Sequence, residues 1–367
     1  MDLQRKILPL LLLLLFYIFI AGTGVDAAPW TYGDSCTAAH RSRIELWYTE
    51  SQTLITSASQ AISRVATDQV ARKHLTAYLG IGFTQGADEV WSVDKASQVR
   101  WKKVQKYIRR ADRLLNQGVL APAMVSPGMV LCDGNIRTRI PWSSAALGKD
   151  GLPLSKIDEK TKEVLEGVPV ELSKIFDEEH ESGLEPWWSQ TLGTYMFEKP
   201  GDYSNLCTNP ARMERIVLGR SVAGHDSEKR NGYMHTGHGF LIFMCPPILR
   251  GLKKYTPTLG SKGAQAPFSD GTPNYLSNVR PHSATLLHEV FHAVSVNQDK
   301  DDFVTDPELL DFAYDLPDIL SLAASKPRDA VRNAESYTMF CLAYWYSMEY
   351  QIAYYPGYVV AQDWVKP

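Results

Sequence analysis

The sequence predicts an α+β fold. Three observations predict it: helical apolar periodicity before residue 120, a few short apolar runs between residues 124 and 245, and further helical patterns after residue 283. Helices first, strands next and helices again are typical of this class. The composition, with 22% charged and 44% hydrophobic residues, is that of a globular protein and excludes wholesale disorder, a coiled coil and a collagen-like fibre.

Two helical stretches are predicted in the N-terminal third. Over residues 41–79, apolar residues recur at spacings near three and four: Ile44, Trp47, Tyr48, Leu54, Ile55, Ala58, Ile62 and Val65. The stretch 87–116 repeats this pattern and carries basic residues on its other side: Lys102, Lys103, Lys106, Arg109 and Arg110. We interpret them as a solvated helix face, with nucleic-acid binding as the alternative. A net charge of −3 gives no general attraction for nucleic acid, so no nucleic-acid partner is expected.

Short apolar runs at residues 124–132, 215–222 and 239–245 predict strands, and Pro246 and Pro247 end the last of them. Residues around 133–206 are rich in glycine, proline and charge. We interpret them as a long insertion with one short helix. The domain prediction is therefore a single domain over 28–367 that carries this insertion.

Residues 1–27 predict a secretory signal peptide. Arg5 and Lys6 precede an apolar run from Ile7 to Ile20, and small residues follow where a signal peptidase cleaves. The run is shorter than the about 20 residues of a transmembrane helix. An uncleaved signal anchor is the alternative. No second run of spanning length follows, so we expect a secreted, extracellular protein without membrane contact after signal removal.

The cysteines fit that compartment. Four of the five could form two disulfides in an oxidising environment, in a pairing that the sequence leaves open: Cys36, Cys132, Cys207, Cys245 and Cys341. We expect Cys341 to be the free one, because the apolar stretch around it is typical of a buried helix.

The candidate metal-binding and catalytic side chains lie in one short segment, His288-Glu289-Val290-Phe291-His292. On a helix, positions i and i+4 share a face, so His288 and His292 would direct two imidazoles at one point, as zinc requires. Glu289 follows the first histidine and would reach a water molecule beside the metal without binding the metal itself. This is the His-Glu-x-x-His arrangement of zinc peptidases. The alternative is a helix whose histidines have another role.

A catalytic zinc site needs a third protein ligand and an open position. Chemistry alone does not choose among the downstream acids: Asp299, Asp301, Asp302, Asp306, Glu308, Asp311, Asp315, Asp318 and Glu335. His225, His235 and His238 lie in a glycine-rich stretch that we interpret as a loop, with a second metal site as the alternative.

A family resemblance indicates which of these acids is the third ligand. The segment reads Asp311-Phe312-Ala313-Tyr314, then Ser321-Leu322-Ala323, then Asn333-Ala334-Glu335. It resembles the aspzincin metallopeptidases, the group of deuterolysin and lysine-specific metallo-endopeptidase. There an Asp-x-x-Tyr-Gly motif, a Ser-Leu-Ala stretch and an Asn-Ala-Asp motif follow the metal helix. Two features differ: Asp315 replaces the motif glycine, and the segment from His292 to Asp311 is longer.

The resemblance implies a zincin-like, mostly helical domain with one zinc ion per chain, bound by His288, His292 and Asp311. It implies Tyr314 as a catalytic hydroxyl, with a packed surface tyrosine as the alternative. It also places Glu335 and Thr338 in a substrate pocket with a preference for basic residues. A role for Glu335 as the third zinc ligand is the competing interpretation.

These features together predict a secreted zinc-dependent endopeptidase acting on proteins or peptides. Glu289 is the expected general base, and Tyr314 would stabilise the oxyanion. The alternative is a catalytically silent zincin-like secreted protein that binds zinc or a surface partner. A zymogen is less favoured, because the resemblance begins near Cys36.

Overall fold

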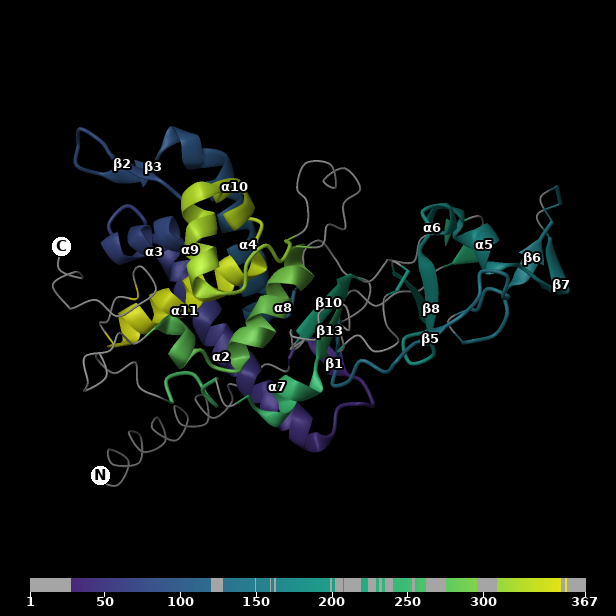
Figure 1. Cartoon of the computed structure of the whole chain (residues 1–367). Helices are drawn as coiled ribbons and strands as arrows, with labels where there is room; N and C mark the ends of the chain where they lie inside the picture. The colour runs from purple at the N-terminus through teal and green to yellow at the C-terminus, as the bar shows by residue number, and fades with distance from the viewer. Residues whose placement is uncertain are drawn as a thin grey trace, which may run out of the picture.

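The computed structural model in Figure 1 combines helices with small sheets, which confirms the predicted α+β class. It describes residues 28–119, 128–148, 150–158, 160–161, 163–198, 200–201, 207, 219–223, 229–230, 233–234, 240–252, 255–261, 275–295, 309–350 and 354. The predicted signal peptide lies outside these residues. Among the helices in the described part of the chain, none is long and apolar enough to span a membrane.

The predicted helix over 41–79 is two helices, α2 (Ala38–Ser63) and α3 (Gln69–Leu79). The break has a local cause. Asp68 adopts an extended backbone, and its side chain accepts a hydrogen bond from the Ala71 amide, which starts a new helix. Gly80, with φ of 61°, ends α3 in the left-handed conformation that glycine adopts most easily.

The prediction for 87–116 was wrong in its first part. Residues 83–93 form a hairpin of β2 (Phe83–Gln85) and β3 (Trp91–Val93), and α4 starts only at Gln98 and ends at Gln117. Asp94 accepts a hydrogen bond from the Ser97 amide and begins a short 3-10 turn before α4. The turn residues override the apolar spacing of Val90 and Val93.

A four-stranded sheet has the order β1-β4-β13-β10. Its strands are β1 (Trp30–Tyr32), β4 (Gly128–Leu131), β13 (Phe240–Met244) and β10 (Gly219–Ala223). The β4 strand pairs in parallel with β1 and β13, and β10 is antiparallel to β13. All three predicted strands are therefore present, within the residues described. Alternate side chains give the sheet two apolar faces.

One face of this sheet packs on the helices, through Val130, Phe240, Ile242 and Met244. The other face packs on the insertion, where Leu131, Leu241 and Phe243 contact Trp187 and Met196. The helices that pack on the first face therefore lie on one side of the sheet, and the insertion lies on the other side.

The insertion contains more strand than predicted and two short helices where one was expected. Its elements are β5 (Thr138–Arg139), β6 (Ser155–Ile157), β7 (Val164–Pro169), α5 (Leu172–Ile175), α6 (Asp177–Glu181), β8 (Glu185–Ser189) and β9 (Thr194–Glu198). In Figure 1 these elements lie on the right, apart from helices α2, α3 and α4. Trp188 points away from the main sheet into a second small core, next to Tyr195.

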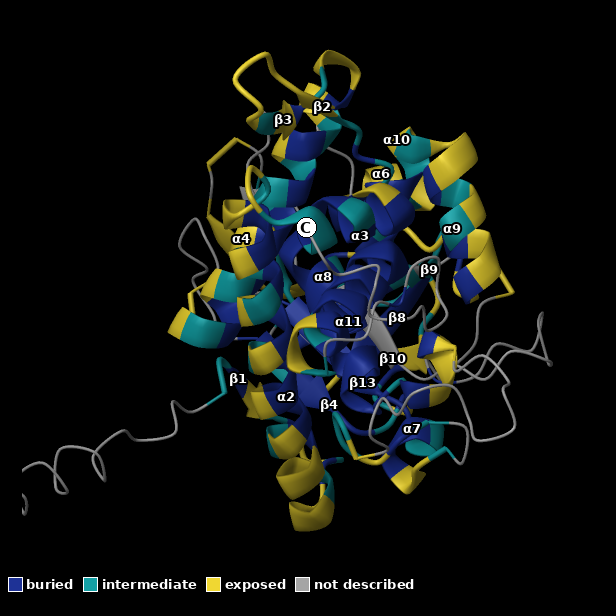
Figure 2. Ribbon diagram, turned by 90° about the vertical axis from the view of Figure 1, so that its left-hand side faces the viewer, coloured by how far each residue is buried: buried dark blue, intermediate teal, exposed yellow. Residues whose placement is uncertain are grey.

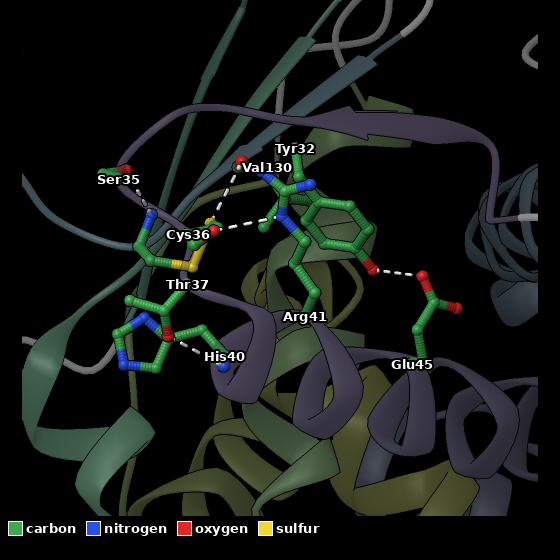
Figure 3. The surroundings of a disulfide bond; sticks show 9 residues. Tyr32, Ser35, Cys36, Thr37, His40, Arg41, Glu45 and Val130 are labelled. Atoms are coloured by element: carbon green, nitrogen blue, oxygen red, sulfur yellow. Dashed lines mark hydrogen bonds between the residues drawn. A yellow bond between two sulfur atoms is a disulfide. The ribbon is translucent and has the colours of Figure 1, made fainter.

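Two disulfides are present, Cys36–Cys132 and Cys207–Cys245, and Cys341 is free and buried, as predicted. Figure 3 shows the first of them at the start of α2. The Thr37 side chain caps that helix, and Arg41 donates a hydrogen bond to the Cys36 carbonyl over 3.0 Å. This cross-link joins the start of α2 to the end of β4.

The C-terminal part supplies α7 (Pro246–Arg250), α8 (Ser283–Ser295), α9 (Leu316–Ser325), α10 (Pro327–Ala330) and α11 (Ala334–Tyr350). Helices α8 and α11 are dark blue through most of their length in Figure 2 and lie at the centre of the molecule, with α2 and α4 around them. Burial on nearly every side explains why α8 has no charged residue besides those of its His-Glu-x-x-His sequence.

Candidate metal centre

Three side chains converge at one point beside α8. Nε2 of His292 lies 3.1 Å from Nε2 of His288 and 3.1 Å from Oδ1 of Asp311. Nε2 of His288 lies 3.3 Å from the same Asp311 oxygen. Within the described residues, these three form the group of histidine, cysteine and acidic side chains that could hold a metal ion. They are the residues predicted as ligands.

The two histidines reach this point because α8 places positions i and i+4 on one face. Their ring centroids are 4.8 Å apart. His288 is almost completely buried, and the Asp311 side chain is 33% exposed. The group therefore opens to solvent on the Asp311 side.

The other ring nitrogens of the histidines have fixed partners. Nδ1 of His288 donates to Oε2 of Glu335 over 2.8 Å. Nδ1 of His292 donates to the carbonyl oxygen of Leu309 over 3.1 Å. Because each Nδ1 donates to a fixed acceptor, the neutral form of either imidazole would have its lone pair on Nε2, directed at the other ring and at a carboxylate. Such a group of three electron-pair donors requires a cation or a proton between them.

The charges around His288 also favour a cation or a proton at this point. Burial alone would lower the pKa of His288, but its hydrogen bonds to Asp311 and Glu335 raise it to about 10. Burial would raise the pKa of Asp311, and the two histidines hold it far below its usual range instead. The centre is thus an anionic setting that favours positive charge on the imidazole side.

The geometry fits zinc. Zinc binds histidine nitrogen and carboxylate oxygen at about 2.0–2.2 Å in a tetrahedron, which places neighbouring ligand atoms roughly 3.3–3.6 Å apart. The observed separations of 3.1, 3.1 and 3.3 Å are close to these values. Two imidazoles and one carboxylate are also a ligand set that zinc accepts, and they leave a fourth position open.

Asp311 reaches the centre because Asn333 holds its segment. The buried Asn333 side chain accepts hydrogen bonds from the amides of Phe312 and Ala313 and donates to the Ala313 carbonyl. On the other side of Asp311, the Leu310 amide donates a hydrogen bond to the Arg332 carbonyl, and the Leu310 carbonyl accepts one from the Ala334 amide. The Asn-Ala-Glu sequence at the start of α11 therefore organises the loop that carries the third candidate ligand. Sequence reasoning did not assign this role to Asn333.

Glu335 and Thr338, which were predicted to line a substrate pocket, have hydrogen-bond partners within the protein. Both residues are completely buried. Both Glu335 oxygens accept hydrogen bonds from Arg280, and Oε2 also accepts from His288. The hydroxyl of Thr338 donates to the Ala334 carbonyl of its own helix. Glu335 thus lies behind His288, outside the group of three ligand atoms, and Arg280 is a neighbour that sequence reasoning missed.

Tyr314 lies at the open side of the centre. Its ring stacks on His288 with centroids 6.0 Å apart, and the residue is 45% exposed. Burial of its hydroxyl and the neighbouring Asp311 carboxylate raise the pKa of Tyr314, so the phenol keeps its proton and can donate it. Asp315, which replaces the motif glycine, has φ of −85° and needs no glycine there.

Glu289 is buried on α8 next to His288, and its carboxylate acts electrostatically on both His288 and Tyr314.

Several sequence candidates lie outside the described residues: His225, His235, His238, Asp299, Asp301, Asp302, Asp306 and Glu308. Asp315 and Asp318 are described and belong to the start of α9, not to the group of three ligand atoms.

Comparison of the chain with protein-family models finds no match, and comparison with curated proteins finds none either.

Proposed function

We propose that this chain is a secreted zinc-dependent endopeptidase. The observation that carries the proposal is the convergence of the His288, His292 and Asp311 donor atoms within 3.3 Å of one another. Each imidazole has its other nitrogen engaged, so all three donors are available to one ion. The order of His288, Glu289 and His292 along α8 matches the arrangement that zinc peptidases use.

A zinc ion held there would lower the pKa of a water molecule and polarise a peptide carbonyl. Glu289 then acts as the general base, since it takes a proton from the attacking water and passes it to the leaving amine. When the water attacks the carbonyl carbon, the negative charge develops on the carbonyl oxygen, and Tyr314 donates a hydrogen bond to this oxyanion. The Tyr314 ring stacks on His288, and Glu289 is the next residue along α8, so both lie beside one of the proposed zinc ligands.

The proposed substrates are proteins or peptides, and the aspzincin resemblance supports the same class. We do not carry over the preference for basic residues, because Arg280 already neutralises Glu335. Two disulfides are compatible with an extracellular location.

The test is casein hydrolysis by the purified chain with and without a zinc chelator. The proposal expects cleavage that the chelator abolishes and added zinc restores. Cleavage that persists in excess chelator, with no zinc in the protein, would contradict it. A zinc-loaded chain that cleaves no peptide would favour the silent zinc-binding alternative.

A further inference from the structure

The side of His288 that faces away from Asp311 contacts a buried ion pair. Glu335 is completely buried, and its Oε2 accepts a hydrogen bond from Nδ1 of His288 over 2.8 Å. Arg280 holds the same carboxylate with two nitrogens: Nη1 contacts Oε1, and Nη2 lies 3.3 Å from Oε2. The Arg280 side chain is only 13% exposed. A chain of charge-assisted contacts therefore runs from Arg280 through Glu335 to the imidazole.

Arg280 itself is fixed in position. Its carbonyl oxygen accepts a hydrogen bond from the Thr256 amide over 2.8 Å. The preceding carbonyl, of Val279, accepts a hydrogen bond from the Tyr346 hydroxyl on α11. The guanidinium also lies over the ring of Tyr255, at 5.2 Å from its centroid. Because α11 carries both Glu335 and Tyr346, one helix holds both members of the ion pair.

The two histidines therefore have unequal partners. His292 donates to a neutral backbone carbonyl, whereas His288 donates to a carboxylate. A carboxylate behind an imidazole fixes the ring orientation and the tautomer, and it makes the opposite nitrogen a stronger electron-pair donor. The guanidinium pairs with this carboxylate, which lies outside the group of three ligand atoms.

We infer that Arg280 and Glu335 are positioning residues of the metal centre, which hold His288 with its Nε2 directed at the ion and so set the zinc affinity. This inference rests on the proposed metal-binding role of the site. It gives Glu335 a function that differs from substrate recognition and adds Arg280 to the residues that the centre requires.

The test measures the zinc dissociation constant by competition with a chromophoric chelator. We expect Glu335→Ala to weaken zinc binding about 10- to 100-fold, the range found for partners of metal-bound histidines. Glu335→Gln should lie between Glu335→Ala and the unsubstituted chain, because the amide oxygen still accepts the Nδ1 proton but has no charge. Glu50→Gln is the control: Glu50 is also a buried carboxylate, but it accepts from the Leu259 amide, away from the ligands. Its zinc affinity should not change.

A second measurement separates positioning from folding. Arg280→Met removes the guanidinium from the buried Glu335 carboxylate and leaves it with the His288 hydrogen bond, so this variant should have the lowest melting temperature in the zinc-free state. The double variant Arg280→Met with Glu335→Gln removes both charges and should recover much of the melting temperature. It should not recover the zinc affinity, since the carboxylate behind His288 is still missing.

Unchanged zinc affinity in Glu335→Gln and Glu335→Ala, or full recovery of affinity in the double variant, would overturn the inference. If Glu335→Ala does not fold, Glu335→Gln and the double variant decide. A chain that binds zinc with the expected variant pattern but cleaves no casein would overturn only the proposed function. A chain without any zinc affinity would overturn both.

Discussion

Asp311 and His292 meet although 19 positions separate them in the sequence: Oδ1 of the aspartate lies 3.1 Å from Nε2 of the histidine. Helix α8 alone supplies only the two imidazoles. The third donor comes from a loop that is attached to the start of α11, so the centre depends on how α8 and α11 pack against each other.

Removal of the Asp311 carboxylate should remove the zinc. We expect Asp311→Ala to lose the stoichiometry of about one zinc per chain, because two imidazoles alone do not form a closed zinc site. Zinc content by mass spectrometry after dialysis measures this. Asp318→Ala is the matched control, an exposed acid on α9 in the same part of the chain. Zinc loss in the control but not in Asp311→Ala would show that Asp311 is not a zinc ligand.

Asn333→Ala should loosen the Asp311 segment. The substitution leaves the amides of Phe312 and Ala313 without their acceptor, at a cost of about 1–3 kcal/mol for the buried Ala313 amide and less for the part-buried Phe312 amide. We expect a lower free energy of unfolding, weaker zinc binding and faster hydrogen exchange at these two amides. If exchange at both amides stays as slow as in the unsubstituted chain, Asn333 does not hold this loop.

Tyr314→Phe should reduce kcat about 10²- to 10³-fold, the usual effect of losing one donor to an oxyanion. Zinc content and KM should change little, because the ring and its packing on His288 remain. Tyr275→Phe is a control of matched exposure, 46% against 45% for Tyr314. Equal kcat values for Tyr314→Phe and the unsubstituted chain would make Tyr314 a packing residue only.

The parts of the site that the sequence predicted are those encoded within one helix. His288, Glu289 and His292 follow from helical periodicity, since a spacing of four residues fixes their common face. Asp311 could not be chosen from its chemistry, because several acids follow α8 and only the family resemblance distinguished one of them. Arg280 and Asn333 were not predicted, since their roles depend on contacts with α8 and with the Asp311 loop that sequence spacing does not encode.

In the fold, too, the elements with a clear local sequence pattern were predicted and the others were not. Strand β13 was predicted from five consecutive apolar residues, which are all buried. Strand β3 and the turn before it were mistaken for helix because Val90 and Val93 match a helical spacing, while Gly86 and Asp88 form the turn. The insertion was assigned too little strand, because β7 is fully exposed and has no buried face to give it a period of two.

His74 should make stability depend on acid. It is completely buried, donates from Nδ1 to the Val70 carbonyl and contacts the Ser347 hydroxyl through Nε2. Burial lowers its pKa from 6.5 to about 4. Because the folded pKa is below the unfolded value, the neutral form stabilises the fold above pH 6.5, and this contribution is lost as the pH falls toward 4. The loss is about 3 kcal/mol.

Denaturant unfolding between pH 7 and 4, with chelator present, checks this. The unsubstituted chain should lose more stability over that range than His74→Gln, whose side chain does not titrate. Other titrating groups are common to both proteins and cancel in the comparison. Identical pH dependence in the two proteins would show that His74 is not responsible.

The most direct test of the account is the rate of casein hydrolysis by Glu289→Gln, measured together with its zinc content. An amide cannot take a proton from water, so we expect a loss of several orders of magnitude in rate. The variant should still hold about one zinc per chain, since His288, His292 and Asp311 are unchanged. Glu181→Gln, an exposed acid on α6, should cleave at the unsubstituted rate. Near-normal hydrolysis by zinc-loaded Glu289→Gln would contradict the account.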